Sequence, residues 1–332
     1  RMQMSTMHDI AKLSNVSVST VSRVLNGKGR VSEKKKAEIL KIVKDMHYVP
    51  DYHAKCMTKS GMISVGLVVS DISNPFFSEL TRGVEFALGD STLLILMDSF
   101  RNVEREKKLV LALRDNGASG VIIGNSYVQD DLVEEISKFL PTVVFDKEYD
   151  LENVGTIMLD NFYGAYMVTK HLIENGCSNI FHLGGTQDLY VSNQRKAGYK
   201  KAMNDFNLEP HVVITGYDDL SGYNMMKKLL SSKEKIDGVF CMNDLVAIGA
   251  LKAAKESGIL IPKDVKFAGF DDIEICKLLE PPLTSVHQPI EEMGKVAAKM
   301  LIEMVDKKAN SKKYVFSPNL VIRESSWKYK SL

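Results

Sequence analysis

The sequence has few of the residues that cross-link a secreted chain or anchor one in a membrane. Its four cysteines, Cys56, Cys177, Cys241 and Cys276, show neither a CxxC pair nor the spacing of metal ligands, which argues against a zinc site and a disulfide framework. No apolar run approaches the roughly 18 residues that a membrane span requires, and no secretory hydrophobic stretch opens the chain. We therefore expect a cytoplasmic protein.

Catalytic motifs are missing as well. The chain contains no GxGxxG, GxxxxGK[ST], GxSxG or HExxH pattern. Residues 32–35 fit SxxK formally, but they lie among surface lysines, so we interpret the match as chance. The sequence therefore predicts no catalytic residue, no metal and no cofactor.

The composition is that of a globular protein, with an uneven distribution of charge. A length of 332 residues, 45% of them hydrophobic, is enough for two or three domains with full cores. Residues 1–61 hold 12 Lys/Arg against 5 Asp/Glu, net +7, and the rest of the chain has a net charge of −6. A basic segment on an acidic body predicts that the first binds an anionic polymer and the second a neutral or small ligand.

Residues 6–27, TMHDIAKLSNVSVSTVSRVLNG, predict two short helices joined by a tight turn. The side chains expected on their apolar faces are Ile10, Ala11, Leu13, Val21, Val24 and Leu25. The opposite face of the second helix presents Val18, Ser19, Ser22 and Arg23. This pattern predicts a helix-turn-helix whose second helix enters a major groove, and the alternative is an ordinary helical hairpin in a core.

Two further segments follow in the N-terminal part. Ser32 begins a predicted helix that reaches His47. Its expected apolar side chains are Ile39, Leu40, Val43 and Met46. Residues 51–59 have too few apolar side chains to fold alone, so they are either a linker or a helix that forms only on DNA.

From Met62 onwards, apolar strand-like runs alternate with helical segments. The first runs are Ile63–Val69, Leu93–Met97, Val121–Ile123 and Thr142–Phe145. The rhythm then restarts for a second sheet at Thr156–Leu159, Ile180–Leu183, Val212–Ile214, Val239–Met242 and Val265–Phe270. Such alternation predicts two doubly wound parallel sheets, whose carboxyl ends face one cleft where ligands bind.

Four separated stretches carry a resemblance that covers the whole chain: DIAKLSNVSVSTVSRVLNG, HYVPDYHAKCM, GFDDIEICKLLEPPLTSVHQP and LVIRESS. The sequence resembles the LacI/GalR family of bacterial transcription regulators. The resemblance implies an all-α helix-turn-helix headpiece (1–50), a hinge (51–61) and an α/β core (62–332) of two doubly wound lobes, similar to periplasmic sugar-binding proteins. The implied N-lobe spans about 62–160 and 289–317, and the C-lobe about 161–287 and 318–332.

The resemblance also implies which residues contact DNA: Thr6, Ser17, Val18, Ser19, Thr20, Ser22, Arg23, Asn26, Ala54 and Met57. Val18, Ser19 and Arg23 occupy the base-reading positions, and Arg23 has the chemistry to bond a guanine bidentately. Met57 stands where most members have a leucine that wedges between central base pairs. We expect residues 51–58 to become helical on DNA.

For the effector, the implied cleft residues are Ser70, Asn74, Phe76, Phe77, Asp98, Asp146, Arg195, Tyr217, Asn243, Asp271 and Gln288. Carboxylates, amides and a guanidinium suit a ring of hydroxyls, with the two phenylalanines against its C–H faces. The prediction is therefore a sugar or sugar phosphate. Leu189 and Val191 stand where the purine regulator has polar contacts, which disfavours a purine.

The predicted function is that of a repressor whose affinity for a near-palindromic double-stranded operator is controlled by the effector. It would act at the nucleoid as a homodimer, since the family's tetramer-forming leucine tail is absent, and without contact with a membrane. The two-lobed core alone would equally support a sugar-binding or transport module, but the headpiece favours the regulator. An enzyme is a third alternative, because such lobes host many reactions. Crossings near Tyr163, 285–289 and Pro318 would let the lobes rotate.

Overall fold

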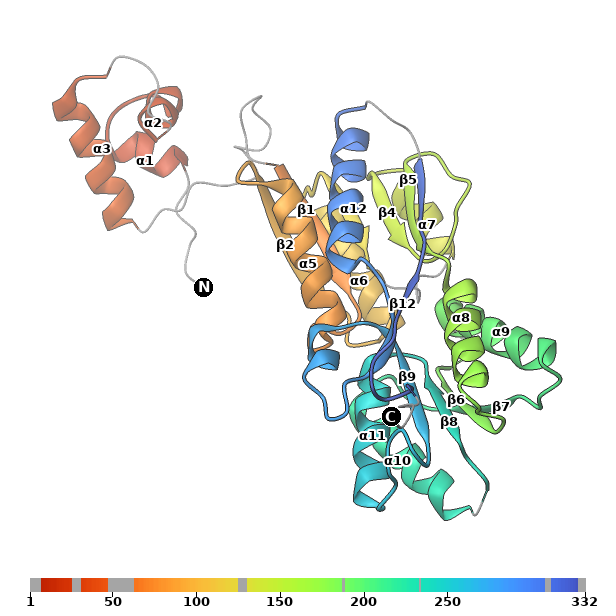
Figure 1. The fold of residues 1–332 in the computed structure, drawn as a ribbon. Helices are drawn as coiled ribbons and strands as arrows, with labels where there is room; N and C mark the ends of the chain where they lie inside the picture. Colours follow the sequence, from red (N-terminus) through yellow and green to blue (C-terminus); the bar gives the residue numbers. More distant parts are fainter. Residues whose placement is uncertain are drawn as a thin grey trace. The chain divides into compact units, whose positions relative to one another are not determined.

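The computed structural model describes residues 7–25, 31–46, 63–124, 130–186, 189–232, 234–307 and 312–327. The expected DNA-contacting residues Thr6, Asn26, Ala54 and Met57, and the hinge, lie outside these ranges. Contacts divide the chain into two compact units, Arg1–Met62 and Ile63–Leu332, whose elements are labelled in Figure 1. In the ranges that the structure describes, no helix combines the length and apolar character needed to cross a membrane.

In its described residues, 7–25 and 31–46, the first unit contains three helices, α1 (Met7–Leu13), α2 (Val18–Leu25) and α3 (Glu33–Asp45). Their core is formed by five buried residues and the side chains packed against them, with Ile10, Val21 and Ile39 fully buried. The tight turn after α1 is closed by Asn15, which has a φ of 48°. The predicted pair of helices with an inward Val21 and Val24 is thus present.

Of the apolar residues predicted on inward faces of this unit, Leu13 and Leu40 are exposed, and the predictions for these two are wrong. Leu13 is 62% exposed and Leu40 is 43% exposed. Ser14 takes the inward position four residues after Ile10, and its Oγ donates to the Ile10 carbonyl at 2.6 Å. Leu40 follows the buried Ile39 and is turned by about 100° away from it around the helix.

The second unit contains two six-stranded sheets. The first sheet has the order β11-β5-β4-β3-β1-β2, and all of its pairs are parallel. Its strands are β1 (Ile63–Val69), β2 (Thr92–Asp98), β3 (Gly120–Ile123), β4 (Thr142–Phe145), β5 (Val154–Leu159) and β11 (Lys312–Phe316). We call this sheet with its helices the N-lobe.

The second sheet has the order β12-β10-β9-β8-β6-β7 and belongs to the C-lobe. Its strands are β6 (Ile180–Gly184), β7 (His211–Ile214), β8 (Gly238–Cys241), β9 (Lys266–Asp271), β10 (Thr284–His287) and β12 (Asn319–Val321). Only the edge pair of β10 with β12 is antiparallel among the described pairs.

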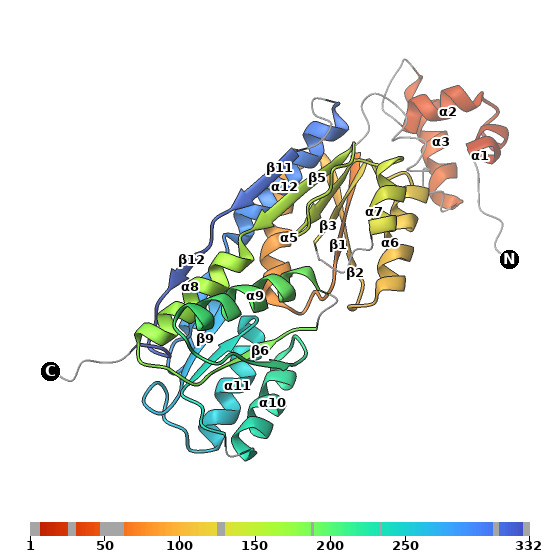
Figure 2. The same cartoon turned by 90° about the vertical axis from the view of Figure 1, so that its right-hand side faces the viewer.

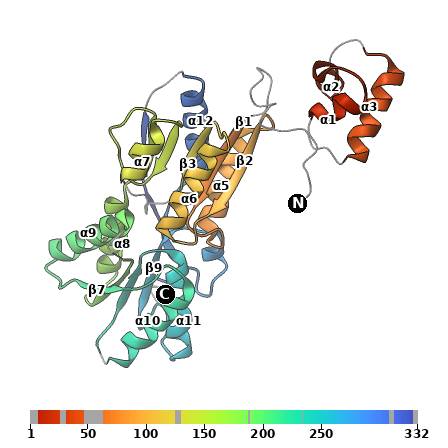
Figure 3. The ribbon, with the colours of Figure 1, turned by 180° about the vertical axis from the view of Figure 1, so that it is seen from behind.

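Helices cover both faces of each sheet. In the N-lobe, α5 (Pro75–Leu88) and α12 (Ile290–Val305) lie on one face, and α6 (Val103–Asp115) and α7 (Asp130–Ser137) on the other (Figure 2). In the C-lobe, α8 (Asn161–Glu174) and α9 (Tyr190–Asp205) lie opposite α10 (Asp219–Ser231) and α11 (Asp244–Glu256) (Figure 3). A 3-10 turn, η1 (Glu274–Lys277), follows β9. The predicted class, two doubly wound lobes, is confirmed.

The prediction from alternating strands and helices assigned one strand to the wrong sheet. Thr156–Leu159 is part of β5, which pairs with β4 and β11 and so completes the N-lobe. The chain crosses to the C-lobe only after it, at Asp160, and crosses again between β10 and α12 and between β11 and β12. The rhythm does not mark these crossings, because a strand that ends one sheet has the same apolar pattern as one that begins the next.

Candidate functional site

A cavity of about 100 Å³ lies between the lobes, at the carboxyl ends of both sheets. Ser70 follows β1 and Asp146 follows β4 in the N-lobe, while Asn243 follows β8 and Asp271 ends β9 in the C-lobe. Parallel sheets place ligands at this edge because the loops after the strands converge there. The expected effector residues that line the cavity are Ser70, Asn74, Phe76, Phe77, Asp146, Arg195, Tyr217, Asn243, Asp271 and Gln288.

Asp98 is the expected effector residue that lies outside the cavity lining in the described part of the chain. Its Oδ2 accepts a hydrogen bond from the Ile72 N–H at 2.9 Å, and its Oδ1 accepts one from the Phe100 N–H at 2.7 Å. Asp98 therefore ties together the loops that follow β1 and β2. The cavity is also lined by residues that were not among those expected to contact the effector: Asp71, Arg101, Gly124 and Met242.

The aromatic wall of the cavity is built at the beginning of α5. The Asn74 side chain caps this helix by accepting from the Phe76 N–H at 3.0 Å, and Pro75 occupies its first turn. The rings of Phe76 and Phe77 meet edge to face, with centroids 5.1 Å apart. Phe77 is buried and also belongs to the hydrophobic core, so it serves both as core and as cavity wall.

Arg195 of α9 is a buried guanidinium held in one position. Its Nε donates to Asn161 Oδ1 at 2.8 Å, and its Nη1 donates to the Met242 carbonyl at 2.5 Å. The guanidinium carbon lies 3.7 Å from the centroid of the Phe270 ring, which supports one face of it. Because the group is fixed before a ligand arrives, little side-chain entropy remains to be lost on binding.

Two carboxylates face this guanidinium. Asp271 Oδ1 lies 3.6 Å from Arg195 Nη1 and accepts a hydrogen bond from Gln288 Nε2 at 2.6 Å. Burial raises the pKa of Asp271 and that of Asp146 to about 6, although the positive charge of Arg195 opposes the rise. Both residues have positive φ, 114° and 73°. Backbone strain of this kind is concentrated at ligand sites.

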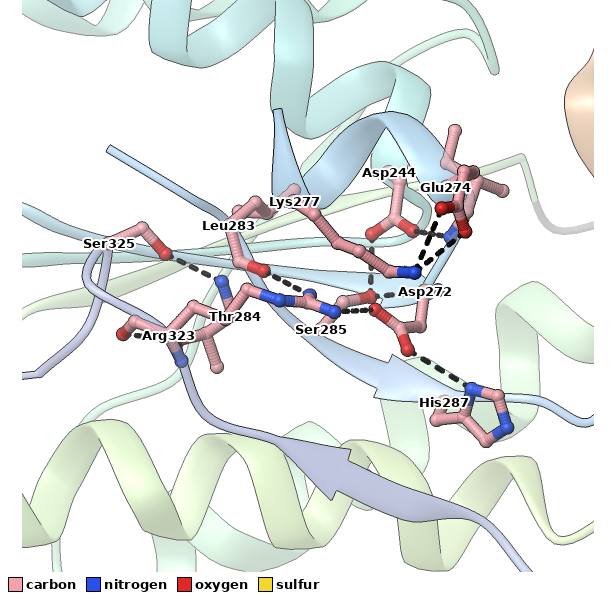
Figure 4. A network of polar contacts seen from close by, with 11 residues as sticks. Asp244, Asp272, Glu274, Lys277, Leu283, Thr284, Ser285, His287, Arg323 and Ser325 are labelled. Atoms are coloured by element: carbon pink, nitrogen blue, oxygen red, sulfur yellow. Dashed lines mark hydrogen bonds and ion pairs between the residues drawn. The ribbon is translucent and has the colours of Figure 1, made fainter. Parts of the chain in front are cut away.

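A polar network fixes the ends of β9 and β10 (Figure 4). Asp244 accepts hydrogen bonds from Ser285 Oγ at 2.6 Å and from the Ile273 N–H at 2.9 Å. Burial, together with the nearby Asp271 charge, raises the pKa of Asp244 to about 7. The cap of α11 is Asn243, which accepts from the Val246 N–H at 2.9 Å. Asp244 therefore joins α11 to β10 instead of capping the helix.

Asp272 points into the same network instead of into the cavity (Figure 4). Its carboxylate pairs with Arg323 Nη2 at 2.7 Å and with His287 Nδ1 at 3.1 Å. His287 directly precedes Gln288, where the chain crosses back to the N-lobe. The adjacent carboxylates thus have separate tasks: Asp271 faces the cavity, and Asp272 secures the crossing.

The raised pKa of Asp146 predicts that Asp146→Asn stabilises the ligand-free protein by an amount that depends on pH. The folded pKa, about 6, exceeds the unfolded value, so folding binds a proton and stability falls as pH rises from about 4 to about 6. Asparagine removes this loss. At pH 8 the free energy of unfolding should rise by about 3 kcal/mol, the equivalent of about two pKa units, and at pH 4 it should change little.

Urea unfolding of this variant at the two pH values measures the effect. Asp90→Asn is the matched control, because Asp90 is exposed in the turn after α5. The buried His182, whose pKa is lowered to about 4, gives the stability the opposite dependence on pH. This contribution is the same in all the proteins compared, so it cancels in the differences. An equal gain at both pH values would show that charge burial is not the cause.

The second candidate site is the outer face of α2. Ser17 directly precedes this helix, with its Oγ 2.8 Å from Ser19 Oγ and 2.9 Å from Thr20 Oγ1. Ser17, Ser19 and Arg23 are exposed, and Val18, Thr20 and Ser22 are partly exposed. The face opposite the buried stripe is therefore hydroxyl-rich with one guanidinium, as an element that reads DNA requires.

Together, a helical unit with such a face and a two-lobed core with a polar cavity define a ligand-responsive DNA-binding regulator. Residues 6–51 match the family model for "Bacterial regulatory proteins, lacI family", and residues 169–326 match that for "Periplasmic binding protein-like domain". The ribose operon repressor of Halalkalibacterium halodurans is 35% identical over 97% of this chain and 97% of its own length. The chain therefore belongs to the LacI family and is a DNA-binding transcription repressor with an effector-binding core.

Solved structures agree with this assignment. A LacI family regulator from Enterococcus faecium with bound ribose is 28% identical, with a TM-score of 0.72, over 79% of this chain and 98% of that one. A complex of the transcriptional regulator CelR with cellobiose is also 28% identical, with a TM-score of 0.71, over 97% of this chain and 99% of that one. Similar folds thus hold both a monosaccharide and a disaccharide.

Proposed function

We propose that the repressor binds a near-palindromic operator as a homodimer and that a neutral monosaccharide in the cavity controls its affinity for DNA. The observation that carries the proposal is the arrangement of Asp146 and Asp271 around the buried Arg195, beside the wall of Phe76 and Phe77. Carboxylates accept hydrogen bonds from sugar hydroxyls, a guanidinium donates to them, and aromatic rings cover the C–H faces.

The charge of the cavity favours a neutral ligand over a phosphorylated one. Two carboxylates, Asp146 and Asp271, surround one guanidinium, and the second guanidinium at the cavity, Arg101, pairs with Asp71 at 2.5 Å. A phosphate would therefore meet at least as much negative as positive charge in a site of low dielectric constant. Of the two classes expected from the sequence, the neutral sugar is the better supported.

The size of the cavity favours a monosaccharide. Its volume of about 100 Å³ is well below the range of roughly 300–1,000 Å³ that is typical of pockets for drug-sized ligands. Leu189 and Val191 contribute an apolar side, which offers nothing to the polar edge of a purine. Ribose appears in the name of the H. halodurans repressor and is bound in the E. faecium structure. D-ribose is therefore the first ligand to test.

Thermal unfolding in the presence of candidate ligands tests the proposal. At 100 times its dissociation constant, D-ribose should stabilise the protein by about 2.7 kcal/mol. D-ribose 5-phosphate and hypoxanthine at the same concentrations should have little effect. Stabilisation by the phosphate ester but not by any neutral monosaccharide would contradict the proposed effector class.

The remaining assignments are part of the same proposal. Residues 1–50 form the headpiece, 51–61 the hinge, and 62–332 the core, whose lobes change their relative orientation when the effector binds. The effector must bind one orientation more tightly, because a ligand with equal affinity for both does not shift the equilibrium between them. A two-fold dimer presents two α2 helices, which explains the symmetry of the proposed operator. The repressor would act in the cytoplasm, at the nucleoid.

A further inference from the structure

Arg101, in the loop after β2, lines the cavity and reaches from one lobe to the other. Its Nη2 lies 2.5 Å from Oδ2 of Asp71 in the N-lobe. Its Nη1 lies 3.5 Å from Oδ2 of Asp218, at the beginning of α10 in the C-lobe. The guanidinium carbon is 5.7 Å from the ring centroid of Tyr217. Arg101 thus lines the cavity and bridges the two walls of the cleft.

The loop that carries Arg101 has an unfavourable backbone held in place by its neighbours. Phe100 and Arg101 have φ of 52° and 57°, which non-glycine residues seldom adopt, least of all in succession. Asp98 accepts from the Phe100 N–H, and the Arg101 N–H donates to the Ser70 carbonyl at 2.9 Å. Strain persists only where the surroundings enforce it. This loop therefore holds the guanidinium between the two lobes.

We propose that Arg101 is a specificity-determining latch, which limits the effector to a monosaccharide and slows its release. The inference rests on the proposed function of the cavity as a site for a neutral sugar. A ligand larger than the cavity has to displace the guanidinium from Asp218 and Tyr217. A bound monosaccharide can leave only after the same contacts across the cleft have broken.

The latch is weak enough to open reversibly. The side chains of Arg101 and Asp218 are 27% and 43% exposed. Solvent screens an ion pair of this kind, and added salt weakens it further. Loss of this one pair should therefore accelerate ligand release by only about two- to fivefold.

Three variants of the full chain test the latch. Asp218→Asn removes the charge but keeps the cap of α10, where Asp218 Oδ1 accepts from the Ser221 N–H at 2.8 Å, because asparagine caps helices equally well. Arg101→Ala removes the whole bridging side chain. Lys108→Ala, at an exposed position of α6, is the control for loss of one positive charge from the same lobe.

Two measurements with sugars give the primary readout. Labelled D-ribose should dissociate about two- to fivefold faster from Asp218→Asn, and faster still from Arg101→Ala, with less dependence on salt than in the wild type. In calorimetric titrations, cellobiose should bind to Arg101→Ala and not to the wild type or Lys108→Ala. Wild-type release rates and wild-type sugar selectivity in Arg101→Ala would overturn the inference.

A ligand-free measurement separates the latch from the proposed function. Amide hydrogen exchange of residues 98–102 and 216–219 should be faster in Asp218→Asn than in the wild type or Lys108→Ala. Failure of the wild type to bind any neutral sugar would refute the proposed function. Unchanged exchange at both segments in Asp218→Asn would refute the latch, whether or not a sugar binds.

Discussion

Asp271→Asn and Arg195→Ala are each expected to abolish the response of operator binding to D-ribose. The two side chains face each other in the cavity, 3.6 Å apart, and both are buried. Removing one of these buried polar side chains leaves its partners in the complex unpaired. Ligand binding should therefore weaken by about 2 to 5 kcal/mol. Operator affinity without ligand should stay at the wild-type level, because neither residue belongs to the DNA-binding unit.

The two substitutions differ in their effect on folding. Asparagine at 271 retains the shape of the side chain and an oxygen that can accept from Gln288. Alanine at 195 also removes the contacts with Asn161, Met242 and Phe270, so Arg195→Ala should lower the free energy of unfolding as well. Asp271→Asn is therefore the more selective test of ligand recognition.

Fluorescence anisotropy of labelled operator, titrated with protein with and without D-ribose, measures the response. Lys200→Ala is the control on α9, since Lys200 is exposed on the same helix as Arg195. A full response in both Asp271→Asn and Arg195→Ala would contradict the assignment of the cavity. Loss of operator binding without ligand would show that the residues act through the fold.

Arg23→Ala is expected to remove the preference for one base pair in each half of the operator. Arg23 is exposed on α2, whose opposite face is anchored by the buried Val21 and Val24. A bidentate contact with guanine contributes about 1 to 3 kcal/mol of discrimination. Binding to sites with the wrong base at that position should change little, because no contact is lost there.

Lys34→Ala provides the contrasting result. Lys34 is exposed in the first turn of α3, where an ammonium group suits a phosphate contact. Its loss should weaken all sequences alike and lower the salt dependence of binding by about one released counterion. In vitro selection of operators by both variants separates the two roles. If Arg23→Ala selects the wild-type operator, the proposed orientation of α2 on DNA is wrong.

The sequence by itself determined the parts of this protein that depend on local pattern. Alternation of apolar runs with helices predicted the parallel sheets, and the bounds of β1 and β4 agree with the prediction to the residue. The same alternation predicted a cleft at the carboxyl ends of the strands, because the parallel strands of a doubly wound sheet end at one edge. The identity of individual cleft residues, such as Tyr217 and Gln288, came from the family resemblance and not from the pattern.

Only the tertiary structure decided which polar residues at these strand ends turn toward the cavity. Asp98 ends β2 and Asp146 directly follows β4, yet the oxygens of Asp98 accept from two backbone N–H groups while Asp146 lines the cavity. Arg101 carries no signal in the sequence, since its importance depends on Asp218, 117 positions away, being brought within 3.5 Å. Hydrogen bonds between loops and contacts between the two lobes set the direction in which these side chains point. Neither can be derived from the periodicity or spacing of residues in the sequence.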